Sequence, residues 1–198
     1  MKKCRMLMAT CALLLMLTAC GSSNKDYDTT TVYIGKNQEV SEYIVEDFDK
    51  SYYNTEELKQ NMEQTIQEYN EKNGSSDLVV LDQYELSDDS AKLNVRIKYK
   101  SAKDYGSIHN CEFFVGTVKE ARETGYVLEG LHAAGAQSAK TLAPVDQMTE
   151  EMVVICEEEM DVEVKGDILY VSDNVSLKSS GLATVGESDT YSVIVYQK

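Results

Sequence analysis

The 198-residue sequence has no tryptophan and one proline, and its 19 basic side chains are outnumbered by 34 acidic ones. The net charge of −15 repels phosphate backbones, which argues against nucleic acid as a partner. The lack of tryptophan weakens a carbohydrate-binding role, although 13 tyrosines keep it open. No glycine-rich phosphate loop, His-Glu-x-x-His, Gly-x-Ser-x-Gly or Cys-x-x-Cys motif occurs. We therefore predict no enzyme activity, no catalytic residues, no cofactor and no metal.

The sequence also lacks a run of about 20 apolar residues, which a membrane-spanning helix needs. Its longest apolar segment, at 6–17 and interrupted only by Thr10, follows a basic segment, and this order is typical of a secretory signal. The sequence Leu-Thr-Ala-Cys-Gly at 17–21 resembles the lipobox of bacterial lipoproteins. The resemblance implies cleavage before Cys20 and a diacylglycerol thioether on its sulfur. The alternative is an ordinary secreted protein that is cut at the same place.

Four parts follow from this interpretation: a signal peptide at 1–19, a lipidated tether at 20–31, an α+β domain at 32–129 and a β-rich C-terminal part at 130–198 that packs on the first. The leader carries three basic and no acidic side chains, so its removal takes the net charge from −15 to −18. The boundary near residue 130 is placed in the small-residue-rich segment 130–144, which holds the only proline.

The clearest helix begins after Asn54, which can cap it together with Glu57 three residues later. Asn73-Gly74 supplies a stop. One apolar face is formed by Leu58, Met62, Ile66 and Tyr69. We expect this face to be buried against the strand face of Leu93, Val95 or Ile97.

The remaining patterns are mostly those of strands, at 31–35, 40–48, 78–86, 91–99, 111–118, 152–156, 162–165, 168–172, 175–178 and 191–196. A phase slip near Gln83 indicates either a bulge or a buried central strand. Gly166-Asp167 is a two-residue hairpin signal, and 191–196 has apolar residues on both faces, as in a central strand. A short helix is expected at 117–124. The predicted fold class is α+β, with one main amphipathic helix on an antiparallel sheet followed by a β-rich C-terminal half.

Several of these segments are similar to small lipoproteins, of no assigned activity, that are common in gut Clostridia. The similarity is carried by Asn-Thr-Glu-Glu-Leu-Lys at 54–59, Val-Arg-Ile-Lys-Tyr-Lys at 95–100, Phe-Val-Gly-Thr-Val-Lys-Glu-Ala at 114–121 and Gly-Asp-Ile-Leu-Tyr-Val-Ser-Asp-Asn-Val at 166–175. It implies an extracytoplasmic location and an α+β ectodomain.

Cys111 and Cys156 are the cysteines left after processing and lipidation, and each lies in an apolar run. Buried free thiols are the favoured interpretation; a disulfide or a catalytic thiol are the alternatives. His109 would share a face with Cys111 in an extended segment and form a nucleophile pair, but a coincidence of spacing is favoured. His132 is expected to be a loop histidine and not a ligand.

Two charged runs remain. The acidic run at 157–163 lacks the spacing of a calcium loop and is expected to be a solvated face. A basic stripe, formed by Lys92, Arg96, Lys98 and Lys100, is expected to pair with acidic neighbours across strands, in preference to binding an anion.

The sequence thus favours a lipid-anchored protein on the extracytoplasmic face of the cell membrane, acting as a non-enzymatic binding or scaffolding module with an envelope protein as a possible partner. The alternative is a solute-binding accessory subunit of an envelope transporter, and an envelope enzyme ranks third.

Overall fold

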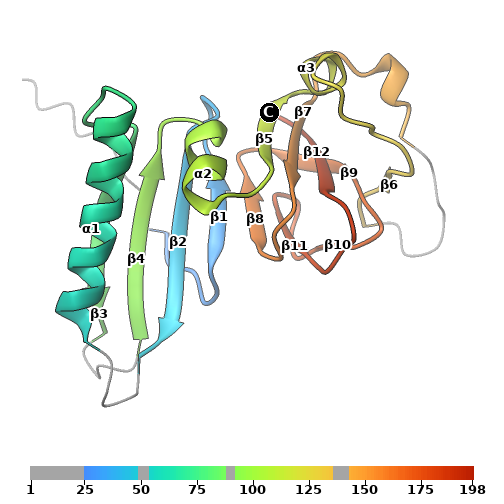
Figure 1. The fold of residues 1–198 in the computed structure, drawn as a ribbon. Helices are drawn as coiled ribbons and strands as arrows, with labels where there is room; N and C mark the ends of the chain where they lie inside the picture. The colour runs from blue at the N-terminus through green and yellow to red at the C-terminus, as the bar shows by residue number, and fades with distance from the viewer. Residues whose placement is uncertain (1–24, 49–53, 88–91, 136–142) are drawn as a thin grey trace, which may run out of the picture.

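A computed structural model describes residues 25–48, 54–87, 92–135 and 143–198. These residues form a mixed α+β fold with two sheets and three α-helices (Figure 1). The predicted signal peptide, Cys20 and most of the expected turn near 87–90 lie outside the described residues.

The larger sheet, sheet A, has the strand order β10-β11-β8-β1-β2-β4-β3. Its strands are β1 (Thr31–Ile34), β2 (Val40–Asp47), β3 (Val79–Leu86), β4 (Lys92–Tyr99), β8 (Asp161–Val164), β10 (Val175–Leu177) and β11 (Leu182–Val185). The expectation of an antiparallel sheet is wrong at one pairing, because β1 and β8 run parallel. That pairing joins strands from the two ends of the chain, which local sequence patterns do not encode.

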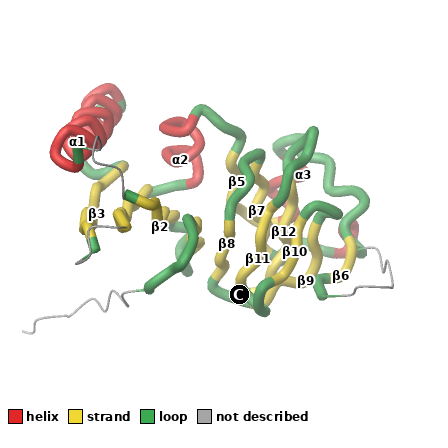
Figure 2. The backbone as a smooth tube through the Cα atoms, turned by 90° about the horizontal axis from the view of Figure 1, so that it is seen from below, coloured by secondary structure: helices red, strands yellow, loops and turns green. Residues whose placement is uncertain are grey.

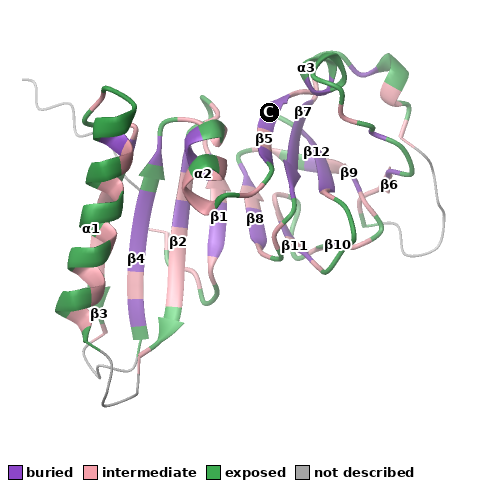
Figure 3. Cartoon of the chain, viewed as in Figure 1, coloured by how far each residue is buried: buried purple, intermediate pink, exposed green. Residues whose placement is uncertain are grey.

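The smaller sheet, sheet B, has the order β5-β7-β12-β9-β6. Its strands are β5 (Phe113–Thr117), β6 (His132–Ala133), β7 (Met152–Cys156), β9 (Asp167–Val171) and β12 (Ser192–Gln197). The expected central position of the last strand is confirmed, since β12 pairs with both β7 and β9. Both β7 and β12 are buried along nearly their whole length (Figure 3).

Gly166 takes the chain from sheet A to sheet B, so the expected two-residue hairpin is wrong. β8 pairs with β1 and β11, whereas β9 pairs with β12 and β6. A Cβ at Gly166 would overlap the backbone carbonyl oxygen of Gln197. Glycine is therefore required here by the close approach of the last strand.

The core is continuous across both sheets. One face of sheet A carries Val32, Ile34, Val95 and Tyr99, and these pack in the same cluster as Val154 and Ile194 of sheet B. The helices α1 (Thr55–Lys72) and α2 (Ala102–His109) lie on that same side of sheet A (Figure 2). The far face of sheet B is covered by α3 (Val118–Glu123) and the segments around Leu128 and Met148.

Helix α1 begins and ends where the sequence predicts. The side chain of Asn54 accepts a hydrogen bond from the backbone N–H of Glu57, and Gly74 follows with a left-handed φ of 68°. The apolar face formed by Leu58, Met62, Ile66 and Tyr69 packs against the core but is only partly buried. The loss of about 2–5 kcal/mol that applies to a fully buried Ile→Ala change is therefore an upper bound at Ile66.

Other local features are confirmed or were missed. The register shift in β3 between Leu81 and Gln83 confirms the bulge, and Thr117 forms the capping box of α3 with Glu120. The helix α2, the strands β6 and β11 and a short 3₁₀ helix at Val145–Gln147 were not predicted. Ser101-Ala-Lys-Asp104 is a capping sequence that could have revealed α2, because Ser101 accepts from the Asp104 N–H.

Asn70, the one fully buried residue of α1, fixes the helix to β3. Its amide nitrogen donates to the carbonyl oxygen of Val79 at 2.8 Å, and its oxygen accepts from the Val79 N–H at 3.0 Å. These two bonds satisfy the Val79 backbone on the side where β3 has no neighbouring strand.

We expect Asn70→Ala to lower the free energy of unfolding by about 1–3 kcal/mol, because it leaves the buried Val79 N–H without a partner. Asn61→Ala is the matched control, since Asn61 is exposed on the same helix and both changes raise helix propensity equally. Chemical denaturation of both variants measures the difference. Equal stability of the two would contradict the role given to Asn70.

Candidate functional site

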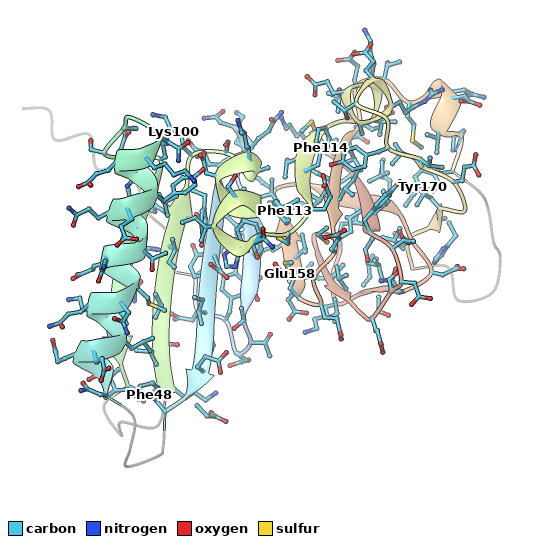
Figure 4. The ribbon with its side chains drawn as sticks, viewed as in Figure 1. Phe48, Lys100, Phe113, Phe114, Glu158 and Tyr170 are labelled. Carbon is cyan, nitrogen blue, oxygen red and sulfur yellow. The ribbon has the colours of Figure 1, made fainter. Side chains whose placement is uncertain are left out.

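A group of buried and half-buried titratable side chains lies where α2 meets both sheets. We call it the junction cluster, and its members are Glu42, Tyr99, Tyr105, His109, Cys111 and Glu158. Figure 4 labels Glu158 and Phe113 in this region, between α2 and sheet B. Four separate stretches of the chain contribute to it, at residues 42, 99, 105–111 and 158.

The fold positions these side chains in a consistent way. Glu42 and Tyr99 come from β2 and β4 on the face of sheet A that carries the core, and they are 5% and 2% exposed. Tyr105 lies on the inner side of α2, and its ring contacts Tyr99 edge-on at 5.1 Å. The ring of His109, at the end of the same helix, stacks on Tyr105 at 4.3 Å.

One half of the junction cluster is centred on Glu42. The Tyr99 hydroxyl donates to Glu42 Oε2 at 2.7 Å. His109 Nε2 lies 3.0 Å from the Tyr99 oxygen and 3.3 Å from Glu42 Oε2. A buried carboxylate is costly unless it is paired, and these two partners provide the pairing.

The other half is centred on Glu158, in the turn after β7. Its Oε2 accepts from the Tyr105 hydroxyl at 3.1 Å and from the Cys111 Sγ at 3.5 Å. Cys156 is buried and free, and Cys111 is half-buried and free. This agrees with the favoured interpretation of two free thiols.

The electrostatics keep both thiols protonated. Burial and the negative charge of Glu158 raise the pKa of Cys111 to about 12. Burial, with smaller effects from Cys111 and Glu158, raises the pKa of Cys156 to about 12 as well. At neutral pH such a thiol is almost entirely protonated, whereas the thiolate is the nucleophilic form.

The pKa of His109 is shifted in the opposite direction to that of an isolated buried imidazole. Burial lowers its pKa, but the hydrogen bond and charge of Glu42 and the charge of Glu158 offset this, so the pKa of His109 lies above its ordinary value. The histidine therefore favours its charged form between the two carboxylates.

His109 and Cys111 do not form the extended pair that their spacing suggested. His109 ends α2, and Asn110 between them is left-handed with a φ of 54°. The histidine turns to Glu42 while the thiol turns to Glu158. The segment is therefore not extended, and the two side chains do not share a strand face.

An open groove of about 800 Å³ borders the cluster at Cys111. Basic, amide and aromatic side chains line it, among them Asn37, Lys100, Lys103, Asn110, Phe114 and Tyr126. The groove can hold a small molecule or a short peptide segment by polar contacts and ring stacking.

No family model matches this chain, and no curated protein or solved structure shows significant similarity to it. The site is therefore interpreted from its own geometry. None of the described helices has the length and apolar character needed to cross a membrane.

The basic stripe and the acidic run at 157–163 have different surroundings in the structure. Arg96 and Lys98 both pair with Asp82, and Lys100 lies 3.5 Å from Asp77, which confirms the cross-strand pairing of the basic stripe at these positions. The acidic run is not simply a solvated face, because Asp161 is 6% exposed and Glu158 belongs to the junction cluster. Within β8, Asp161 and Glu163 alternate with the core residues Val162 and Val164 and lie on the opposite face of sheet A.

His132 lies in β6, and its Nδ1 is 3.4 Å from Asp173 Oδ1. Within the described ranges, no group of three or more His, Cys, Asp or Glu side chains is placed to hold a metal ion. Cys20, the one site residue predicted from the sequence, lies outside those ranges. Sequence reasoning missed Glu42 and Tyr99, whose role depends on a pairing between distant strands.

We expect both native thiols to resist a water-soluble alkylating reagent at neutral pH, because Cys156 is buried and the raised pKa keeps half-buried Cys111 protonated. Intact-mass measurement should find two labels only after unfolding. Glu158→Gln should speed the labelling of Cys111, since it removes the charge that raises the pKa, whereas Glu129→Gln on an exposed loop should not. Rapid native labelling of wild-type Cys111 would contradict this and restore a reactive thiol.

The raised pKa of His109 also predicts that the stability of the protein depends on pH. Because its folded pKa is raised above the unfolded value of about 6.5, its contribution is complete below that value and is lost as the pH rises through the folded pKa. His109→Gln should therefore destabilise the protein more at about pH 5.5 than at about pH 8.5. Glu42→Gln should reduce this pH dependence in a double-mutant cycle. A cost of His109→Gln that does not change with pH would refute the pairing.

Proposed function

We propose that this chain is a lipoprotein held by Cys20 on the extracytoplasmic face of the cell membrane, where it acts as a non-enzymatic binding or scaffolding module. The lipobox-like segment at 17–21 supports the anchor. The similarity to lipoproteins of gut Clostridia agrees with a Gram-positive cell envelope as the location. An envelope protein is the partner we expect.

The single observation that carries the non-enzymatic part is the state of the junction cluster. Its carboxylates, histidine and tyrosines hold one another in place, and the pKa of its thiol is raised to about 12. An active site needs a nucleophile or base whose pKa is shifted toward the working pH. Here the pKa of the thiol is shifted away from the working pH, and the histidine, whose pKa is raised, is held by Glu42 and Tyr99 within the cluster.

The architecture behind this role is a main amphipathic helix on a sheet, followed by a β-rich half. Contacts of Leu58, Met62, Ile66 and Tyr69 with the core support the first element, and the position of β7 to β12 after residue 151 supports the second. We place the boundary near residue 130, with the second part packed on the first, as the shared core cluster suggests.

The groove beside Cys111 favours a second candidate, a solute-binding accessory subunit of an envelope transporter. Its volume of about 800 Å³ is in the range of small-molecule sites, which are about 300–1,000 Å³. The two functions differ in what the groove holds. A solute would appear as extra mass in native mass spectrometry that is lost on unfolding, whereas a scaffold would show none.

The anchor is tested by replacing the predicted lipid-bearing cysteine. Mature wild-type protein should partition into the detergent phase, because two acyl chains suffice for stable anchoring. Cys20→Ser should leave the protein uncleaved or release it from the membrane fraction. Cys111→Ser is the matched control and should behave as wild type. Normal processing and membrane retention of Cys20→Ser would disprove the proposal.

A further inference from the structure

The face of sheet A that points away from α1 and α2 is covered by neither sheet B nor a described helix (Figure 2). We call it the outer face. The strand register places on it Tyr33, Tyr43, Arg96, Lys98, Asp161 and Glu163. It is thus a polar face with aromatic rings, opposite the helical layer, on which Arg96 and Asp161 are themselves buried.

The N-terminal segment of the described chain lies on this outer face. Lys25 pairs with Glu163 and its Nζ is 3.9 Å from the centroid of the Tyr33 ring. The ring of Tyr27 lies 4.7 Å from that of Tyr43, and Thr29 donates to Asp161 at 2.6 Å. Residues 25–31 are therefore held by the fold, although the sequence assigned them to the tether.

The length of chain before Lys25 limits how the domain can meet a membrane. Five residue steps separate Lys25 from Cys20, and a fully extended chain covers at most about 18 Å in that distance. A membrane touching the far side of α1 would be about 20 Å or more from the outer face, given the width of a helix and its separation from a sheet. The helical side is thus out of reach of an anchor at Cys20.

We propose that the outer face of sheet A, over β1, β2 and β4, lies against the phospholipid headgroups of the membrane that holds the anchor. This inference rests on the proposed lipidation of Cys20. It adds an interaction surface and its partner, which lipidation alone does not specify.

The chemistry of the outer face fits a headgroup layer. Tyrosine is enriched at membrane interfaces because its ring is apolar and its hydroxyl is polar, and Tyr27, Tyr33 and Tyr43 gather here. Lys98 keeps 46% of its side chain exposed while it pairs with Asp82, so it can also reach lipid phosphate.

The outer face and the helical side differ in how well their acidic side chains are balanced by basic ones. The carboxylates of Asp82, Asp161 and Glu163 each have a lysine or arginine partner. Acidic side chains outnumber basic ones on α1, where Glu56, Glu57, Glu63, Glu68 and Glu71 are exposed and the two lysines are Lys59, which pairs with Glu63, and Lys72. Anionic lipid would repel the helical side more strongly, which favours the same orientation.

The absence of tryptophan from the sequence allows a direct test. Full-length lipidated protein carrying Tyr43→Trp is reconstituted into phosphatidylglycerol–phosphatidylcholine vesicles, brominated near the headgroup end of the acyl chains. Bromine quenches only nearby indole rings. Gln60→Trp, on the exposed side of α1, and Val127→Trp, on an exposed loop beyond α3, are the matched controls. Tyr33→Trp is a second reporter in case Tyr43→Trp fails to fold.

We expect brominated lipid to reduce the fluorescence of Tyr43→Trp or Tyr33→Trp roughly twofold, as for an interfacial indole, and to leave both controls unchanged. Equal quenching at all positions, or quenching only at Gln60→Trp or Val127→Trp, would overturn the orientation. Intact-mass measurement shows whether Cys20 carries the lipid, and so distinguishes a wrong orientation from a missing anchor. Lipid on Cys20 without quenching at Tyr33 or Tyr43 refutes the docking face alone, whereas absence of the lipid refutes the proposed function and this inference with it.

Discussion

The parallel pairing of β1 with β8 is the constraint on which the rest of the structure depends. It places Thr31 opposite Asp161 and so joins the beginning of the folded chain to its β-rich C-terminal half. Through it, sheet A becomes long enough to carry α1 and α2 at one end and to pack against sheet B at the other. Without it β8, β10 and β11 would not belong to the same sheet as β1 to β4.

The junction cluster forms because that arrangement brings polar side chains together where α2 and the two sheets meet. Bringing three layers together buries Glu42 and leaves Glu158 partly buried, and each finds hydroxyl, imidazole or thiol partners at the same junction. Buried networks of this kind are tolerated when every member is satisfied. Their perturbed pKa values arise here from packing, so perturbation alone does not identify a catalytic centre.

The sequence was informative where the signal is local. The caps of α1, the alternation in β4 and the two-sided apolar pattern of β12 all depend on neighbouring residues, and the structure contains each. It failed for α2, where Gly106 weakens the helical pattern, and for β11, a four-residue strand just after Gly181. The candidate site was only partly visible: His109 and Cys111 stood out, but no local pattern could assign Glu42 to the histidine.

The position of β12 has a consequence for how the chain reaches its native state. This last strand lies in the middle of sheet B, between strands that end some 20 and 35 residues earlier. In sheet A, β1 can pair with β8 only after about 130 further residues have been made. Contacts between distant segments slow folding, because the loop-closing entropy comes before the stabilising contact. Neither sheet can be completed while the C-terminal residues are still being synthesised. The order of its strands is therefore compatible with the export that we propose, in which the chain would cross a membrane unfolded and fold on the far side.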